Sequence, residues 1–316
     1  MKYIVFVDGQ EGTTGLEIND RLAKRSDIEI LRIDPERRKD PEARRALLNE
    51  ADIAFLCLPD TASRESVSLA GSGKTRIIDA STAYRTDPGW TYGLPELSQK
   101  QREAIRDSSR VSVPGCHATG FNLALYPLVQ EGIVPRDYPV TCHSVTGYSG
   151  GGKKLIEQYE AAGDQKKNLE SPQFYALGLS HKHLPEMQKV SGLLNPPVFT
   201  PIVGNFYRGM AVAVPLVKQG LAKKMTAGEV RDFMASYYDG ERFVRVMPFE
   251  SENYLDKGFL NATACNSTNR VEICVFGHDE QILIVSRFDN LGKGASGAAV
   301  QNMNIMLGAD EGAGLE

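Results

Sequence analysis

The chain has 316 residues, of which 41% are hydrophobic and 24% charged, and its formal net charge is −4. This length predicts two domains, each with enough apolar material for a core. The weakly acidic balance does not favour nucleic acid as a partner. The sequence has no apolar run of about 18 residues, so no transmembrane helix or membrane partner is expected. Its five cysteines lack CxxC spacing, which argues against a disulfide framework and favours a cytoplasmic location.

The first third of the chain alternates apolar runs with helix-like segments. Residues 3–8, "YIVFVD", are typical of a buried strand and too short for the apolar core of a signal peptide. Strands are expected at 3–8, 28–34, 51–60, 75–82 and 110–115, with helices at 15–25, 41–50, 62–73 and 98–109. Strands and helices that alternate at this spacing predict a parallel, doubly wound α/β sheet.

The pattern changes after residue 120. Longer strand-like runs lie at 138–150, 196–205, 210–217, 242–249, 271–279 and 281–290. Antiparallel pairing with one open face predicts a second, α+β domain. The small and apolar residues of 292–308 have helical spacing, and we expect this tail to pack on the first domain. The expected division is residues 1–115 plus 290–316 for the first domain and 116–289 for the second.

A glycine loop connects the first strand to the first helix. Gly9, Gly12 and Gly15 have the spacing GxxGxxG, a variant of the dinucleotide-binding fingerprint. Such glycines let the backbone approach a pyrophosphate at a helix N-terminus. Thr13 and Thr14 add hydroxyl donors. The alternative is a turn that needs glycine only for its backbone angles. The position between strand and helix favours a Rossmann-type dinucleotide site.

The end of the second strand bears on the choice of nucleotide. Asp34 stands where an acidic residue often binds the ribose hydroxyls of NAD. Arg32, Arg37 and Arg38 lie beside it and are suited to the 2′-phosphate of NADP, or to a solvated helix start. The local sequence does not decide whether the cofactor is NAD or NADP.

Cys116 differs from the other four cysteines. It follows Pro-Gly at the end of an expected strand and opens the helix-like run "CHATGFNLALYPLVQEG". A helix N-terminus favours the thiolate, and ligands bind at this edge of open α/β sheets. Cys57, Cys142 and Cys274 lie inside strand-like runs, and Cys265 has no evident activating neighbour. Cys116 is therefore the candidate nucleophile, and a buried inert thiol is the alternative.

A thiolate beside a nicotinamide indicates reduction of an acyl group through a thioester. This chemistry needs an acid–base group, and "SHKHLPEM" offers His181 and His183. His117 adjoins the thiol, but neighbouring helix residues are expected to point apart. A zinc pair is the alternative for the two histidines, although the sequence suggests no third ligand. Pro185 favours an extended approach to the site, with Glu186 near a helix start and positioned to hold one histidine.

Several segments together resemble the N-acetyl-γ-glutamyl-phosphate reductase family, in its shorter bacterial form. They are "DGQEGTTGLEI", "FLCLPDTAS", "IIDASTAYR", "YGLPEL", "VPGCHATGF", "VTGYSGGGK", "HKHLPEM" and "DNLGKGASGAAVQNMN". They occur in the family's order over nearly the whole chain. The resemblance implies NADPH-dependent reduction of N-acetyl-γ-glutamyl phosphate to the semialdehyde and phosphate, in arginine biosynthesis. It also implies a Rossmann domain closed by the C-terminal helix and a second α+β domain.

The resemblance carries over onto individual residues. Cys116 is the implied nucleophile, and of "HKH" we favour His183 over His181 as the acid–base group. The "GKG" of residues 292–294 (Gly292, Lys293 and Gly294) is assigned to the cofactor site with the glycine loop and Arg32. Longer members have "PGCYPT" where this chain has "PGCHAT", so His117 is a departure from that form.

The anionic substrate requires cations, because guanidinium groups pair bidentately with phosphate and carboxylate. Arg85, in "STAYR", and Arg208, in "NFYRGM", are the candidates; surface ion pairs are the alternative. We expect no metal, and a homo-oligomer that is a dimer or tetramer.

Three other functions compete with this interpretation. Aspartate-semialdehyde dehydrogenase shares the expected fold, the thiol chemistry and a similar "DNLxKGA" tail, but "YGLPEL" and "HKHLPEM" favour the acetylglutamyl enzyme. The glycine loop argues against a Cys–His hydrolase, which needs no nucleotide. The position of Cys116 argues against a dinucleotide-sensing protein without catalysis.

Overall fold

The chain divides into two compact units. A computed structural model describes residues 2–71, 73–161, 168–249 and 252–315. Unit 1 comprises Met1–Pro114 with Ala295–Glu316, and unit 2 comprises Gly115–Gly294. This division groups residues 290–294 with unit 2, next to Cys116, although the sequence pattern predicts them in the first domain.

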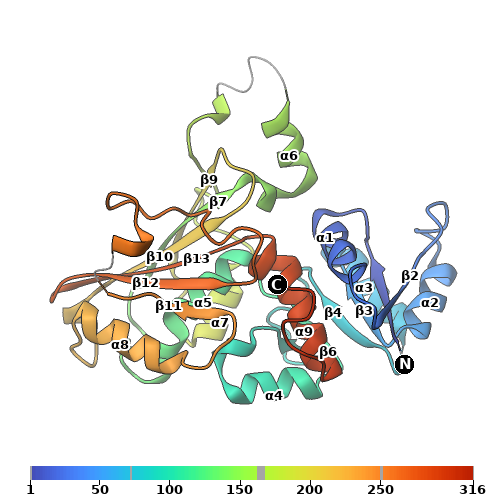
Figure 1. The fold of residues 1–316 in the computed structure, drawn as a ribbon, viewed down its shortest axis with the longest axis horizontal. Coiled ribbons are helices and arrows are strands. Elements are labelled where there is room, and N and C mark those ends of the chain that lie inside the picture. Colours follow the sequence, from blue (N-terminus) through green and yellow to red (C-terminus); the bar gives the residue numbers. More distant parts are fainter. Residues whose placement is uncertain (1, 72, 162–167, 250–251, 316) are drawn as a thin grey trace. The chain divides into compact units, whose positions relative to one another are not determined.

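Unit 1 is a doubly wound α/β structure (Figure 1). Its strands are β1 (Tyr3–Asp8), β2 (Ile28–Leu31), β3 (Ile53–Leu56), β4 (Arg76–Asp79), β5 (Thr91–Tyr92) and β6 (Arg110–Ser112). Its helices are α1 (Thr13–Leu22), α2 (Pro41–Glu50), α3 (Asp60–Ala70), α4 (Gln99–Asp107) and α9 (Gly297–Leu307). The strands pair in the order β2-β1-β3-β4-β6-β5, and every pair is parallel. The fold class predicted from the sequence is confirmed, and the short strand β5 is an addition to it.

The C-terminal helix returns to unit 1, as its sequence predicts. Helix α9 packs against α1, α4 and β4. Polar side chains fix it there: the Asn302 amide donates to the Gly93 carbonyl at 2.9 Å, and the Gln301 amide donates to Glu96 at 2.7 Å. Ten consecutive residues of this helix are buried, which explains why its sequence is small and apolar.

Unit 2 is built on a mixed sheet. Its strands are β7 (Thr141–Gly147), β8 (Gln173–Phe174), β9 (Val198–Gly204), β10 (Met210–Val217), β11 (Val244–Val246), β12 (Val271–Gly277) and β13 (Gln281–Phe288). Its helices are α5 (Cys116–Gln130), α6 (Gly152–Glu160), α7 (Leu184–Ser191) and α8 (Ala227–Tyr237). The strand order is β11-β12-β13-β10-β7-β9-β8. The pairs β7–β9 and β11–β12 are parallel, so antiparallel pairing holds for only part of the sheet.

Helix α5 covers one face of this sheet together with α8 (Figure 1). Strand β10 alternates buried and partly exposed residues, as expected when one face is packed and the other is more open. A Cβ atom at Gly120 of α5 would lie 2.6 Å from Val212 Cγ2 and 2.8 Å from Phe288 Cε1. The absence of a side chain at Gly120 therefore sets how closely α5, which begins at Cys116, approaches the sheet.

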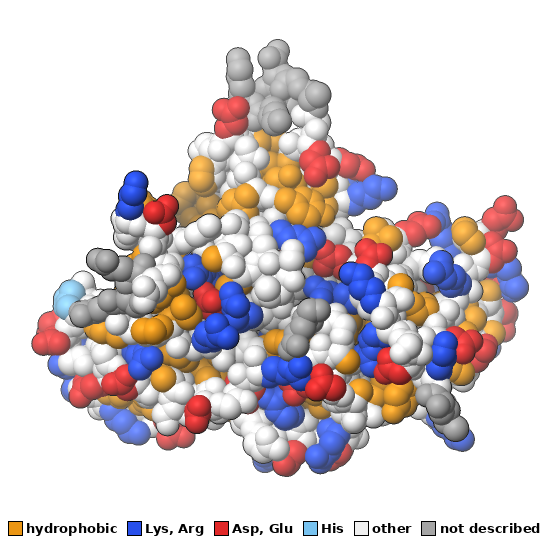
Figure 2. Space-filling model, viewed as in Figure 1, with side chains coloured by type: hydrophobic (Ala, Val, Ile, Leu, Met, Phe, Trp, Pro, Cys, Tyr) orange, Lys and Arg blue, Asp and Glu red, His pale blue; other side chains and the backbone are white. Residues whose placement is uncertain are grey.

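The surface carries charges of both signs. Figure 2 shows acidic and basic side chains interspersed over the face in view, with no single-sign field across either unit. Among the described helices, none combines the length and the hydropathy that a membrane crossing requires.

We predict that Gly120→Ala destabilises unit 2 by about 1–3 kcal/mol, because the added methyl group overpacks the contact between α5 and the sheet. Gly228→Ala is the matched control, since a Cβ there meets no atom within 4 Å. Alanine in place of a helical glycine should stabilise α8 by up to about 1 kcal/mol. Urea unfolding of both variants measures the difference, and equal stability of the two would contradict the role given to Gly120.

Candidate active site

Cys116 is the first residue of α5, as the sequence predicts. The N-cap residue Gly115 has no side chain with which to cap the first-turn N–H groups of this helix. The Gly115 N–H donates to Glu186 Oε2 at 3.1 Å. Glu186 lies in the first turn of α7 and its side chain is only 1% exposed. This bond fixes the start of α5 against the start of α7.

The segment 292–294 lies against the thiol residue. A Cβ atom at Gly294 would stand 2.9 Å from the Cβ atom of Cys116, so no other residue fits there without displacement. Gly292 is equally confined, because a Cβ atom there would stand 2.4 Å from the carbonyl oxygen of Thr268. Lys293 is fully buried in the short π-helix Gly292–Ser296. Such helical irregularities are frequent at functional sites. The cofactor role of these three residues stays a prediction.

Two histidines gather beside Cys116. Three atoms that could each bind a metal lie within 4.8 Å of one another, one from each of Cys116, His117 and His183. The His181 ring lies 4.7 Å from the His183 ring and 5.6 Å from the His117 ring, measured between centroids. The expectation that His117 points away from the thiol is wrong. Cys116 and His117 occupy the first turn of α5, and the loop that carries His181 and His183 packs over this turn and meets both side chains.

His117 is held by two hydroxyl groups. Its Nδ1 lies 2.7 Å from Ser144 Oγ of β7, and its Nε2 lies 2.8 Å from the Tyr175 hydroxyl. Burial, with a smaller contribution from His181 and Lys182, lowers the pKa of His117 to about 3. The imidazole is therefore neutral at pH 7. Burial and the nearby Cys116 raise the pKa of Tyr175, so this phenol keeps its proton.

The histidine segment reaches the site through a turn at Lys182 and His183 that leads directly into α7. Helix α7 begins at Leu184, and its N-cap His183 has φ −88° and ψ −13°. The expected extended approach is wrong because Pro185 falls in the first turn, where the missing N–H costs nothing and the fixed φ is helical. His181 Nδ1 accepts a hydrogen bond from the His183 N–H at 3.2 Å. Glu186 stands at the helix start, as expected, and its Oε2 accepts from Gly115.

The other four cysteines have environments that suppress thiolate formation. Burial raises the pKa of Cys57, Cys142 and Cys265, and raises that of Cys274 to about 12. Cys57 and Cys116 are both partly exposed, but Cys116 alone of the five is the first residue of a helix. Among the five cysteines, Cys116 has the surroundings that favour a nucleophile.

The two candidate arginines lie in different units. In unit 1, Arg85 donates through Nε to the Val113 carbonyl at 3.0 Å and through NH2 to the Ala80 carbonyl at 3.2 Å. In unit 2, Arg208 lies 3.4 Å from the buried carboxylate of Asp289, and its side chain is 25% exposed. The bonds of Arg85 tie together two strand ends, whereas Arg208 stays partly exposed beside the segment that leads to Gly292.

The glycine loop of unit 1 is tightly packed at two of its three glycines. Gly9 has φ +88°, and a Cβ there would lie 2.4 Å from the Cys57 carbonyl oxygen. A Cβ on Gly15 would lie 2.5 Å from the Gly9 carbonyl oxygen, whereas one on Gly12 meets no atom closer than 3.5 Å. Gly12 is also the N-cap of α1 and provides no side-chain cap to its first turn. The space at Gly12 and the uncapped N–H groups of Thr13 and Thr14 fit a pyrophosphate.

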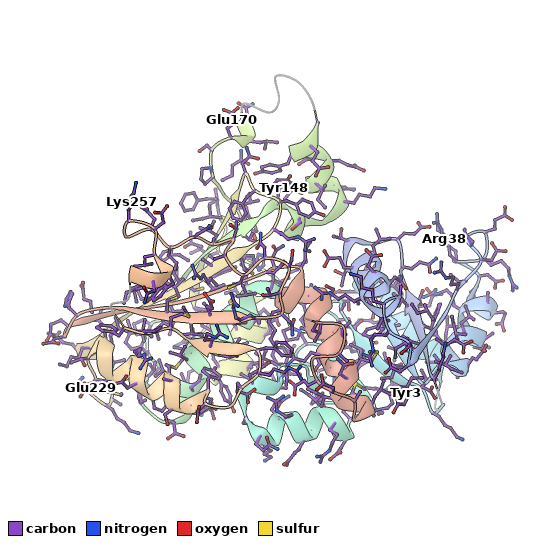
Figure 3. The ribbon with its side chains drawn as sticks, in the orientation of Figure 1. Tyr3, Arg38, Tyr148, Glu170, Glu229 and Lys257 are labelled. Atoms are coloured by element: carbon purple, nitrogen blue, oxygen red, sulfur yellow. The ribbon has the colours of Figure 1, made fainter. Side chains whose placement is uncertain are left out.

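Basic side chains lie close to this loop. Arg38 forms an ion pair with Glu11 of the glycine loop, and Arg37 pairs with Asp40 at 2.7 Å. Figure 3 shows Arg38 on the segment of unit 1 that precedes α2. Arg32 and Asp34 are exposed at the end of β2, and Asp34 accepts the Glu36 N–H at 2.9 Å.

The fold and the thiol site define a semialdehyde dehydrogenase. The family model "Semialdehyde dehydrogenase, dimerisation domain" matches residues 116–290, and "Semialdehyde dehydrogenase, NAD binding domain" matches residues 36–107. Unit 1 is thus a domain for a nicotinamide dinucleotide. Among solved structures, aspartate semialdehyde dehydrogenase II of Vibrio cholerae aligns with a TM-score of 0.71 at 18% identity, covering 97% of this chain and 98% of that one.

Comparison with curated sequences identifies the family within this class. It is 50% identical to "N-acetyl-gamma-glutamyl-phosphate reductase 2" of Nostoc sp. over 98% of both sequences. It is likewise 50% identical to "N-acetyl-gamma-glutamyl-phosphate reductase" of Trichormus variabilis over 98% of both. The chain belongs to the N-acetyl-gamma-glutamyl-phosphate reductase family, as its motifs predict.

Sequence reasoning missed three contacts of the site. It did not predict the contacts of Ser144 and Tyr175 with His117, nor the contact of Glu186 with Gly115. Ser144 is one of the buried residues that alternate with more exposed ones along β7, and this alternation places it on the packed face. Tyr175 belongs to a segment with no periodic signal, and its position follows from the edge strand β8 just before it.

We predict that Gly12→Val weakens dinucleotide binding by at least about tenfold and leaves unit 1 folded, because its side chain would occupy the open space of the glycine loop. Gly15→Ala is the contrasting variant, since its Cβ collides with the loop backbone and should lower stability. Nucleotide titration by fluorescence and thermal unfolding separate the two effects. Unchanged affinity in folded Gly12→Val protein would show that the loop is only a turn.

Proposed function

We propose that this protein catalyses the NADPH-dependent reduction of N-acetyl-γ-glutamyl phosphate to N-acetylglutamate semialdehyde and phosphate, in arginine biosynthesis. The observation that carries the proposal is Cys116 at the uncapped start of α5, with His117 and His183 beside it. The relatives at 50% identity bear the name of this activity. The name of the matching dimerisation domain supports a homo-oligomer, and we propose a cytoplasmic one.

The chemistry begins with the thiol. The Cys116 thiolate attacks the acyl carbon and expels phosphate, which leaves a thioester on Cys116. NADPH, when bound, supplies the hydride that converts this thioester to a thiohemiacetal. His183 donates the proton that the new hydroxyl group requires. The hydroxyl returns this proton to His183 as the C–S bond breaks, which releases the aldehyde and restores the Cys116 thiolate. The first-turn N–H groups of α5 favour the thiolate and the developing oxyanion.

The proposal of NADP rests on the basic residues near the glycine loop. Arg32 is exposed at the end of β2, and Arg38 is held against Glu11 of the loop itself. Guanidinium groups at this place suit the 2′-phosphate that distinguishes NADP from NAD. Asp34 accepts a backbone N–H of its own turn, which gives this carboxylate a local structural task.

Arg208 is the better candidate of the two arginines for the substrate's phosphate or α-carboxylate. Its guanidinium is partly exposed in unit 2, the unit that holds Cys116. Arg85 directs two of its donors at backbone carbonyls within unit 1. We propose Arg208 as a contact of the anionic substrate and a secondary role for Arg85.

The test of the whole proposal is phosphate-dependent oxidation of N-acetylglutamate semialdehyde, assayed with NADP and in parallel with NAD. Aspartate semialdehyde in the same assay tests the rival activity. The proposal requires a higher kcat/KM for the acetylglutamyl substrate and for NADP. A preference for aspartate semialdehyde would replace the proposed substrate, and a preference for NAD would replace the proposed cofactor.

We predict that Cys116→Ser abolishes measurable turnover, because a serine hydroxyl is a far poorer nucleophile at neutral pH. NADPH affinity should be retained, which fluorescence titration checks. Cys142→Ser is the matched control. Because this thiol is fully buried in β7, its substitution should leave kcat near the original value. Reductase activity of Cys116→Ser close to that of the unmodified protein would exclude the thioester mechanism.

We predict that His183→Asn lowers kcat by roughly 10²–10⁴-fold, the usual effect of losing an acid–base group. His181→Asn should cost less, because His181 lies outside the Cys116–His117–His183 group and its Nδ1 accepts the His183 N–H. Steady-state kinetics of both variants decide the assignment. A larger loss in His181→Asn would reverse it, and small losses in both would place the acid–base role elsewhere.

A further inference from the structure

We infer that the thiol site is also a binding site for Zn²⁺ and related soft divalent cations, with Cys116, His117 and His183 as its three protein ligands. One ligand atom of each residue lies within 4.8 Å of the others. The sequence alone offered only the His181 and His183 pair. The structure keeps His183 of that pair and adds Cys116 and His117 from the first turn of α5.

The ligand types match the metal. Zn²⁺ prefers thiolate sulfur and imidazole nitrogen, at about 2.3 Å and about 2.0–2.1 Å respectively. Tetrahedral geometry at these bond lengths puts the ligand atoms about 3.3–3.6 Å apart. Metal binding therefore requires the three atoms, now within 4.8 Å of one another, to draw closer together. Three protein ligands leave the fourth position open, as in zinc sites that exchange a water molecule.

The contacts of His117 also suit a metal ligand. A metal ligand must offer a lone pair, which an imidazole ring nitrogen supplies. Its two nitrogens contact the hydroxyls of Ser144 and Tyr175, so metal binding exchanges one of these hydroxyl contacts for a coordinate bond. The remaining hydroxyl then orients the ring, which is the usual arrangement around a metal-bound histidine.

The charge of the bound ion is balanced close by. Zn²⁺ with one thiolate and two neutral imidazoles carries a net charge of +1. Glu186, whose side chain is 1% exposed, is anchored by the N–H of Gly115, the residue next to Cys116. A buried cation is costly without such a partner. Bound metal occupies the sulfur lone pair that attacks the substrate, so zinc should inhibit the reductase.

Metal binding itself does not depend on the proposed reaction, whereas inhibition does. The experiment therefore measures binding first, on the full-length protein stripped with EDTA and desalted. Co²⁺ is the spectroscopic probe, because a thiolate ligand gives a near-ultraviolet charge-transfer band and tetrahedral geometry gives strong visible bands. Zn²⁺ then displaces Co²⁺, and its affinity is obtained by competition.

We expect one Co²⁺ per chain with a thiolate charge-transfer band that Cys116→Ser eliminates. His117→Gln and His183→Gln should each weaken Zn²⁺ binding by at least about tenfold, the lower end of what is lost even for residues outside the coordination shell. His181→Gln is the control and should retain the affinity, since this residue is outside the group of three. Circular dichroism confirms that each variant is folded.

Absence of the thiolate band would overturn the site. Unchanged affinity in folded His117→Gln would remove the third ligand and overturn the three-residue arrangement. Should His117→Gln fail to fold, the unmodified protein supplies the test: Zn²⁺ must slow alkylation of Cys116 by iodoacetamide, and an unchanged rate rejects the proposal. Metal binding without inhibition of the reductase would support the metal site and contradict the role of Cys116 as the nucleophile of the proposed reaction.

Discussion

The hydrogen bond from the Gly115 N–H to Glu186 is the contact on which the site depends. It joins the first turns of two helices that begin far apart in the sequence, α5 at Cys116 and α7 at Leu184. Cys116, the proposed nucleophile, belongs to one turn, and His183 is the N-cap of the other. Loss of the Glu186 carboxylate would leave a buried N–H unpaired and remove the anion between two helix N-termini, whose dipoles both favour negative charge.

The remainder of unit 2 keeps these two turns in place. Helix α5 rests on the sheet at Gly120, where there is no room for a side chain, and α7 packs along α5. Gly294 lies on another side of the thiol residue, where a Cβ atom would stand 2.9 Å from the Cβ atom of Cys116. The thiol is thus surrounded by regular structure on several sides, which is how a scaffold fixes a reactive group to within a fraction of an ångström.

The sequence predicts those parts of the site that depend on local rules. A Pro-Gly-Cys step between a strand and an apolar helix places Cys116 at a helix start, and a GxxGxxG loop places Gly12 over α1. Helix periodicity places His117 wrongly, because it describes directions along one helix and says nothing of a loop that packs over its end. The Tyr175 contact with His117 depends on β8 pairing with β9 at the edge of the sheet, a long-range pairing that no spacing in the sequence reveals. Pro185 has two local interpretations, a helix stop or a first-turn residue, and only the packing of α7 on α5 decides between them.

The same properties underlie both roles proposed for Cys116. A thiolate at a helix start, with imidazoles beside it, is suited to be a nucleophile and a soft metal ligand for the same electronic reason. The protein cannot weaken the sulfur as a ligand without weakening it as a nucleophile. The availability of the imidazole nitrogens can be limited instead. The hydroxyls of Ser144 and Tyr175 each form a hydrogen bond with one ring nitrogen of His117. These two hydrogen bonds do not involve the thiol, but they compete with a metal cation for His117. Their strength therefore determines how readily zinc displaces substrate from the site.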